Sequence, residues 1–129
     1  MSQANVMDVR HELEAVLDRV LRDTGCRAIA IARTDGLVVA HRGASWLDPR
    51  VVAAVAATMV GAAEVAAEQL GQGDIEEITI RCTQGRIIAV NAGPEAVVIA
   101  LYGRDENLGL VILTLSRATE AIARLLEQV

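Results

Sequence analysis

The sequence contains no phenylalanine and no lysine, and its only aromatic side chains are Trp46 and Tyr102. Hydrophobic residues nevertheless make up 53% of the 129 positions, so the chain can bury an aliphatic core, and its composition excludes disorder. The shortage of aromatic side chains argues against nucleic-acid modules that stack bases on them. The absence of lysine excludes a Walker A loop, Schiff-base chemistry and a lysine general base.

Positive charge and cysteine are also scarce. Twelve arginines against 17 acidic residues give a net charge of −5, which disfavours binding to nucleic-acid backbones and anionic membranes. The two cysteines, Cys26 and Cys82, are too few for a disulfide framework or a cysteine-rich zinc site. The first residues show no apolar signal region. We therefore expect one domain over residues 1–129 in the cytoplasm, without cofactor or metal.

The most informative stretch is a long apolar helix between Asp48 and Leu70. Asp48 followed by Pro49 is typical of a helix start, and Gly71 is typical of a helix end. No residue from 51 to 63 is charged, so the helix must be buried on more than one side. This uncharged run of 13 residues is shorter than the roughly 20 residues of a membrane span.

Two faces of this helix are predicted to have different neighbours. Ala53, Ala57 and Gly61 recur at i, i+4 and i+8 and form a smooth ridge that another helix can approach closely. A chain of this size has one core to offer, so we infer that a second copy covers the ridge; the alternative is a central helix buried inside a monomer. The bulkier face is predicted to lie on a sheet and consists of Val52, Val55, Met59, Ala66 and Leu70.

The remaining pattern predicts an α+β fold with element order α-β-β-α-β-β-β-α. Helical spacing predicts a first helix over residues 6–24 and a last helix from residue 106 to the C-terminus. The last helix is predicted to be capped by Asp105 or Asn107. Strands are predicted at 28–32, 37–40, 77–82, 86–92 and 96–103, and the last of these belongs in the middle of the sheet. Asp35-Gly36 marks a hairpin turn. The five-stranded sheet should be largely antiparallel, with helices on both faces.

No pattern predicts an enzyme. Candidate bases, nucleophiles and metal ligands lack the partners or the spacing that catalysis requires, since neighbouring strand glutamates point to opposite faces and helix glutamates at i, i+4 usually only solvate the helix. The surplus of apolar surface instead indicates protein–protein contact. The candidates considered are His11, His41, Cys26, Cys82 and the pairs Glu64/Glu68 and Glu76/Glu77.

The chain resembles the Roadblock/LC7 domain family over roughly residues 6–126, a profilin-like fold. The resemblance rests on TGCRAIAIARTDGLVVAHR after the first helix, on the alanine- and valine-rich helix, and on NLGLVILTL at residues 107–115. It is similar to the prokaryotic motility and polarity regulators that partner a Ras-like small GTPase.

What this resemblance implies is a homodimer. Central helices would pack side by side, and the third strand, Ile75–Arg81, would pair with its copy through Ile75, Glu77, Thr79 and Arg81. The paired helices would present Arg50, Ala53, Ala57, Gly61, Glu64 and Glu68 to the dimer mate and to a small GTPase. Any effect on GTP hydrolysis would be indirect, acting on the switch loops. Arg50 as an arginine finger is the alternative, although a first-turn arginine is usually a surface residue.

Two other functions remain open from the sequence. One is an assembly scaffold that acts without a GTPase, and the other is a small-molecule sensor, because PAS and GAF domains also combine helices with antiparallel sheets. A sensor requires a cavity lined by polar and often aromatic groups, and the sequence offers almost none.

Overall fold

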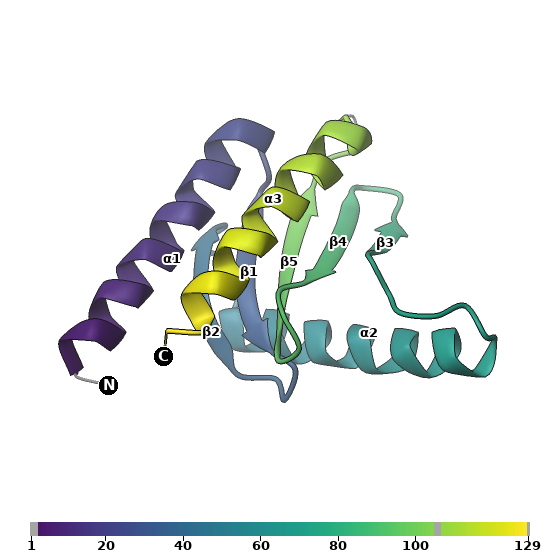
Figure 1. Cartoon of the computed structure of the whole chain (residues 1–129). Helices are drawn as coiled ribbons and strands as arrows, with labels where there is room; N and C mark the ends of the chain where they lie inside the picture. The colour runs from purple at the N-terminus through teal and green to yellow at the C-terminus, as the bar shows by residue number, and fades with distance from the viewer. Residues whose placement is uncertain (1–2, 105–106, 129) are drawn as a thin grey trace.

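The computed structural model describes residues 3–104 and 107–128. Within these ranges the chain forms three helices and one five-stranded sheet (Figure 1). The predicted order and class are confirmed. The elements are α1 (Gln3–Thr24), β1 (Ala28–Arg33), β2 (Val38–Gly43), α2 (Pro49–Gln69), β3 (Ile78–Arg81), β4 (Arg86–Asn91), β5 (Ala96–Tyr102) and α3 (Leu108–Leu126).

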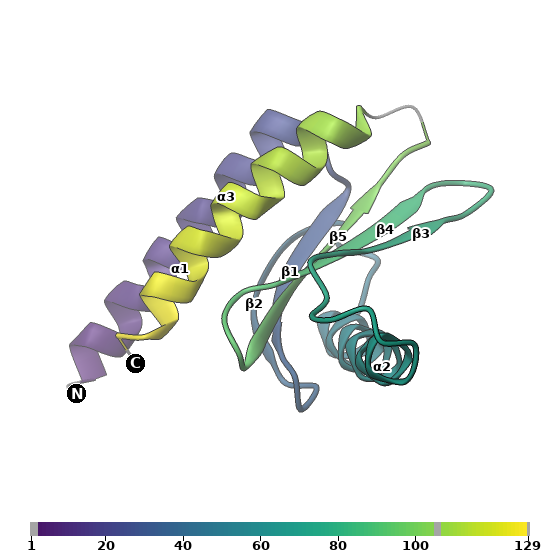
Figure 2. The ribbon, with the colours of Figure 1, turned by 45° about the vertical axis from the view of Figure 1, so that its right-hand side comes forward.

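The sheet separates two unequal helical layers. Its strand order is β2-β1-β5-β4-β3, and all neighbouring strands are antiparallel. Helices α1 and α3 lie side by side on one face, while α2 lies alone on the other face and runs across the strands (Figure 2). Strand β5 is central, as its continuous apolar run predicts, and β3 forms one edge of the sheet.

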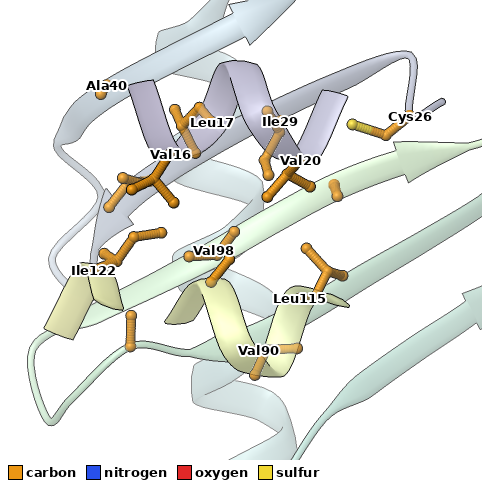
Figure 3. Packing of buried hydrophobic residues seen from close by; sticks show 14 of the residues in the cluster. Val16, Leu17, Val20, Cys26, Ile29, Ala40, Val90, Val98, Leu115 and Ile122 are labelled. Carbon is orange, nitrogen blue, oxygen red and sulfur yellow. The ribbon is translucent and has the colours of Figure 1, made fainter. Parts of the chain in front are cut away.

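The larger core fills the space between the sheet and the α1/α3 pair. Leu17 and Leu115, one from each helix, are fully buried against Ile29 and Val98 of the central strands (Figure 3). These side chains recur at helical spacing on α1 and α3 and at alternate positions on the strands, so each element turns one face inward. The aliphatic composition thus suffices for a packed core without phenylalanine.

The smaller core lies under α2 and consists of short side chains. Ala53, Ala56 and Val60 are buried against Ala30 and Ile99 of the sheet. Because alanine side chains are short, α2 can lie close to the sheet, and the apolar layer between them is narrow. Helix α2 therefore rests on the sheet through one narrow face.

Short sequence motifs predicted the positions of the turns and helix caps correctly. Gly36 follows Asp35 in the β1–β2 hairpin with φ +95°, and its N–H donates to the Arg33 carbonyl at 2.9 Å, which confirms the predicted turn. Strand β2 runs further than predicted, to Gly43, because it continues to pair with β1 as far as Ala28. At α3, Asn107 is the cap, with its Oδ1 accepting from the Leu110 N–H at 3.1 Å. The alternative cap at residue 105 and the predicted start at residue 106 lie outside the described residues.

A buried hydroxyl pair joins the central strand to the end of α1. Tyr102 Oη donates to Thr24 Oγ1 at 3.0 Å, and Thr24 Oγ1 donates to the Val20 carbonyl at 2.7 Å. We expect Tyr102→Phe to lower the free energy of unfolding by about 1 kcal/mol, the usual net value of one buried hydrogen bond. Urea denaturation would measure the change, and an unaltered midpoint would show that this bond contributes nothing.

An ion-pair cluster fastens α1 to the edge strand β2. Arg42 of β2 contacts the carboxylate of Glu14, and its Nε lies 3.0 Å from Asp18 Oδ1. The hydrogen bond from Arg42 holds the pKa of Glu14 below its usual range. Since the folded-state pKa is lowered, the stabilisation is complete above the ordinary glutamate pKa and is lost as the pH falls through the folded-state value.

Acidification should therefore separate the wild type from a Glu14→Gln variant. We expect the melting temperature of the wild type to fall more steeply between roughly pH 5 and pH 3, because only the wild type loses the charged Glu14–Arg42 pair. Thermal unfolding followed by circular dichroism at several pH values measures this. Parallel melting curves for the two proteins would contradict the assignment.

Candidate functional site

Helix α2 starts and ends where the sequence predicts. The Asp48 carboxylate accepts from the Arg50 backbone N–H at 2.9 Å, Pro49 occupies the first turn, and Gly71 follows the end with φ +66°. By length and composition the helix, with 21 residues and a mean hydropathy of 1.6, could cross a membrane. Its face of Ala53, Ala56 and Val60 packs on the sheet instead, which favours a helix of a folded domain.

The two faces of α2 differ from the prediction. Ala53, assigned from the sequence to the ridge that meets a partner, has no exposed surface, because it packs against the sheet. Val55 and Leu70, assigned to the sheet, are instead exposed by 43% and 71%, and Ala66 is exposed as well. Val52 and Met59 are partly buried against the smaller core, as predicted. Side-chain size therefore does not decide which face of α2 meets the sheet, since Val60 is buried there while Ala62 and Ala66 are exposed.

The outward face of α2 is a continuous apolar stripe. Its members recur at steps of three and four residues, the spacing of one helix face, so the sequence contains the signal although the stripe was not among the predicted site residues. A contiguous apolar stripe that is exposed to solvent is typical of a surface that another protein covers. The stripe residues, all exposed, are Val51, Val55, Thr58, Ala62 and Val65.

The C-terminal half of α2 has little cover from its own chain. None of residues 61–69, all of which the structure describes, is buried, and these turns reach past the edge strand β3 (Figure 1). A Cβ built on Gly61 would meet no atom within 4 Å, whereas Ala57 lies beside the β1–β2 hairpin, near Gly36. Gly61 is thus available to a partner, and Ala57 is only half-buried.

Arg50 is held by the cap of its own helix. Its Nη2 lies 3.2 Å from Asp48 Oδ2 and its Nε lies 3.3 Å from Asp48 Oδ1. Hydrogen bonds from the Arg50 side chain and backbone keep the pKa of Asp48 below its usual range, and the same pair raises the pKa of Arg50. The guanidinium is exposed but oriented along the start of α2.

Strand β3 is shorter than predicted. It comprises residues 78–81, so Thr79 and Arg81 lie in the strand while Ile75 and Glu77 precede it. Glu77 still lies on the same face as Thr79, since the Thr79 hydroxyl donates to Glu77 Oε2 at 3.1 Å. The predicted edge position is correct, and Ile80 on the α2 side is exposed by 37%.

One hollow brings together predicted residues from the helix and the segment before β3. A pocket of about 510 Å³ between the end of α2 and the chain before β3 is lined by Glu64, Glu68, Asp74 and Ile75, among others. Although carboxylates gather here, no group of three or more histidine, cysteine, aspartate or glutamate side chains in the described part of the chain is arranged to hold a metal ion. On α2 the hollow continues the sheet-facing row of Ala53, Ala56 and Val60, so it lies on a different face from the outward side of the helix.

The histidine and cysteine candidates do not line this hollow. His11 on α1 and His41 on β2 are exposed, Cys26 is buried in the larger core, and Cys82 is exposed in the β3–β4 turn. The exposed Trp46, which the sequence analysis did not select, lies just before α2 with 75% of its surface open. An uncovered tryptophan beside an apolar stripe is the kind of residue that anchors protein interfaces.

Comparison with known proteins identifies the family. Residues 12–101 match the Roadblock/LC7 domain. The chain belongs to the Roadblock/LC7 family. A Methanocaldococcus jannaschii protein, MJ1340, is 34% identical over 111 residues, which cover 83% of this chain and 96% of the relative.

Solved Roadblock/LC7 structures share the fold over nearly the whole chain. MglB, the gliding protein of Thermus thermophilus, and an MglB in a tetrameric arrangement each have a TM-score of 0.85 and 27% identity. Each alignment covers 94% of this chain and 93% of the other. Profilin II of Acanthamoeba castellanii, 20% identical over 84% of this chain and 94% of its own, has a TM-score of 0.55, which confirms the profilin-like architecture.

Proposed function

We propose that this Roadblock/LC7 protein is a non-enzymatic homodimer that regulates or docks a Ras-like small GTPase in the cytoplasm of a prokaryote. Two α2 helices pack side by side in the dimer, and the GTPase binds the surface that they form together. An effect on GTP hydrolysis is indirect, through the arrangement of the GTPase switch loops.

The open apolar stripe of α2 carries this proposal. A helix whose outward valines and alanines meet only solvent leaves a surface of the kind that a partner covers, and the open end of α2 around Gly61 admits a second helix closely. Membership of the family and similarity to MglB, one example of which is known in a tetrameric arrangement, support self-association. A closed two-fold dimer requires such a self-complementary patch.

A role for Arg50 as an arginine finger receives no support from the geometry. Its guanidinium is engaged by Asp48, and an arginine finger must extend freely into the active site of the GTPase. We therefore assign the paired helices a docking role, with Glu64 and Glu68 as the exposed charges at their open ends.

A nucleotide-dependent capture experiment tests the GTPase. Purified protein is immobilised and exposed to lysate of the native organism with GDP or with a non-hydrolysable GTP analogue. Enrichment of a small Ras-like GTPase in one nucleotide state supports the proposal. Capture of other proteins regardless of nucleotide would replace it with a GTPase-independent scaffold.

Trp46 provides a direct readout for the captured GTPase. Because it is the only tryptophan and lies exposed beside α2, its fluorescence should shift towards shorter wavelength when a partner covers that end of the helix. A tryptophan-free GTPase variant titrated with each nucleotide gives the affinities. Turnover of GTP with and without the protein then separates an activator from a docking platform.

Gly61→Leu should weaken self-association without harming the fold. Beyond the neighbouring backbone of its own helix, no atom lies within 4 Å of a Cβ at this position, so the subunit has room for a side chain there, and glycine is a poor helix residue. Between two close helices the same side chain costs about 1–3 kcal/mol through overpacking. Analytical ultracentrifugation measures the dissociation constant, and an unchanged value would remove Gly61 from the interface.

A further inference from the structure

Three arginines from three different strands converge at one end of the sheet. Arg81 ends β3, Arg86 begins β4, and Arg104 follows the end of β5. Together with Cys82 they line a hollow of about 160 Å³ beside the β3–β4 turn, and none of the lining residues is acidic. The chain as a whole carries a net charge of −5, so this hollow is a local concentration of positive charge on an acidic protein.

Strand pairing places the arginines on one face of the sheet. Arg81 lies directly opposite Arg86, and Arg86 lies directly opposite Tyr102. Residues opposite each other in neighbouring antiparallel strands share a face. Tyr102 belongs to the larger core, so both strand arginines lie on the α1/α3 side of the sheet, and Arg104 lines the same hollow two residues beyond Tyr102. The β3–β4 turn projects beyond α1 and α3, and the side chains of Arg81 and Arg104 are exposed (Figure 2).

The backbone holds the β3–β4 turn against the end of β5. The Cys82 N–H donates to the Gly85 carbonyl at 2.8 Å, which closes the turn. A Cβ at Gly85 would lie 2.5 Å from the Tyr102 carbonyl oxygen, so the turn approaches β5 this closely only because residue 85 is glycine. The two strand arginines are therefore carried on a closed turn, and the chain that leaves β5 brings Arg104 beside them.

The positive charges of the hollow are not matched by nearby acids. Within residues 3–104 and 107–128, no ion pair joins Arg81 or Arg104 to a carboxylate. Glu77, which precedes Arg81 on the same face of β3, accepts instead from the Thr79 hydroxyl at 3.1 Å. Arg81 also faces Arg86 across the strand pair, and like charges in that position destabilise a sheet. An anion bound in the hollow would offset this cost.

The number and kind of these side chains favour a phosphoryl group as the ligand. A guanidinium is planar, keeps its charge, and donates two parallel hydrogen bonds to an oxyanion. A carboxylate offers two oxygens and one negative charge, whereas a phosphate monoester offers three terminal oxygens and a charge of about −1.5 to −2 at pH 7. Three arginines around one hollow match the phosphate monoester in both respects. Arg27 adds positive charge at this end of the sheet, since its Nη2 would lie 3.4 Å from a Cβ on Gly103.

We propose that this hollow binds a phosphate monoester, which Arg81 and Arg104 hold from two sides, with Arg86 on the strand between them. The phosphoryl group belongs either to a small free molecule or to a phosphorylated side chain of another protein, and its recognition by the arginines is the same in both cases. All of the lining residues come from one chain, so the site does not depend on the proposed homodimer or on a GTPase.

An NMR titration with inorganic phosphate at constant ionic strength tests the site. We expect saturable shifts of the Arg81 and Arg104 side-chain N–H signals, with a dissociation constant on the order of 1 mM. Arg81→Gln and Arg104→Gln should each weaken binding about tenfold, because each removes a hydrogen bond between charged groups. Arg124→Gln is the matched control, since it removes the same charge from an exposed position in the last turn of α3, at the far end of that helix from Arg104. The control should bind phosphate like the wild type.

The outcomes decide the site, the ligand and its source in turn. The absence of a saturable shift, or equal affinity in the wild type and both hollow variants, would overturn the site. Equal affinity for acetate and for phosphate would overturn the phosphoryl assignment, because a general positive patch does not distinguish the two anions. AMP and N-acetyl-O-phosphoserine amide, titrated in the same way, distinguish the sources. Tighter binding of AMP supports a free small molecule, and tighter binding of the phosphoserine compound supports a phosphorylated protein.

Discussion

Gly43→Ala should lower the free energy of unfolding by roughly 3 kcal/mol or more, the largest loss expected from one added methyl group in this chain. A Cβ at this position would lie 2.5 Å from the Arg27 carbonyl oxygen and 2.8 Å from Ala28 Cα, and the backbone has φ +94°. Both obstacles are backbone atoms, so neither can rotate away. The strand pair β1–β2 would have to separate at the point where β2 ends.

Gly61→Ala is the matched control for this prediction. Gly61 has no neighbour within 4 Å of a Cβ and lies inside a helix, so alanine there should stabilise the subunit by about 0.5–1 kcal/mol. Equilibrium denaturation of both variants at several protein concentrations separates folding from association. A Gly43→Ala protein as stable as the wild type would contradict the close approach of β2 to Arg27.

Val55→Glu should convert the proposed homodimer to monomers while the subunit stays folded. Val55 is 43% exposed on the outward stripe of α2, so a glutamate there is solvated in the monomer and favours the helix slightly more than valine does. In the dimer it would bury an unpaired carboxylate in each subunit. We expect a cost of roughly 3 kcal/mol, about 100-fold in the dissociation constant.

Leu113→Glu provides the comparison for Val55→Glu. Leu113 is similarly exposed, by 50%, but it lies on α3, on the opposite side of the sheet from α2. Sedimentation velocity should show the Leu113→Glu protein associating like the wild type. Equal loss of association in both variants would mean that added negative charge, and not the α2 surface, controls self-association.

Caps and turns could be predicted because each depends on local chemistry. Asp48 before Pro49 fixes the start of α2, Asp35-Gly36 fixes the hairpin, and Asn107 caps α3, all through contacts within a few residues. The central place of β5 followed from its unbroken apolar run. These features required no knowledge of the packed molecule.

The face of α2 that meets the sheet could not be predicted from the sequence alone. A helix that is apolar nearly all round has no polar face to identify the outside, so the choice between Ala53 and Val55 depends on the closeness of packing. Ala53, Ala56 and Val60 pack on the sheet, and Val55 is exposed on another face of the helix. The pattern of apolar and polar residues identifies the buried face of α1 and of α3, but it does not identify the buried face of α2.

The length of β3 could not be predicted from its local sequence pattern either. Ile75 and Glu77 continue the alternating pattern, but β4 pairs only with residues 78–81, so regular pairing within the chain stops there. Edge strands depend on the neighbour that they find.

Light scattering coupled to size-exclusion chromatography tests the central claim most directly, which is that a second copy covers the outward face of α2. At tens of micromolar protein, this account predicts a mass of twice the 13.7 kDa chain, or a multiple of that dimer. A mass of 13.7 kDa under the same conditions, with the apolar stripe exposed to solvent, would contradict it.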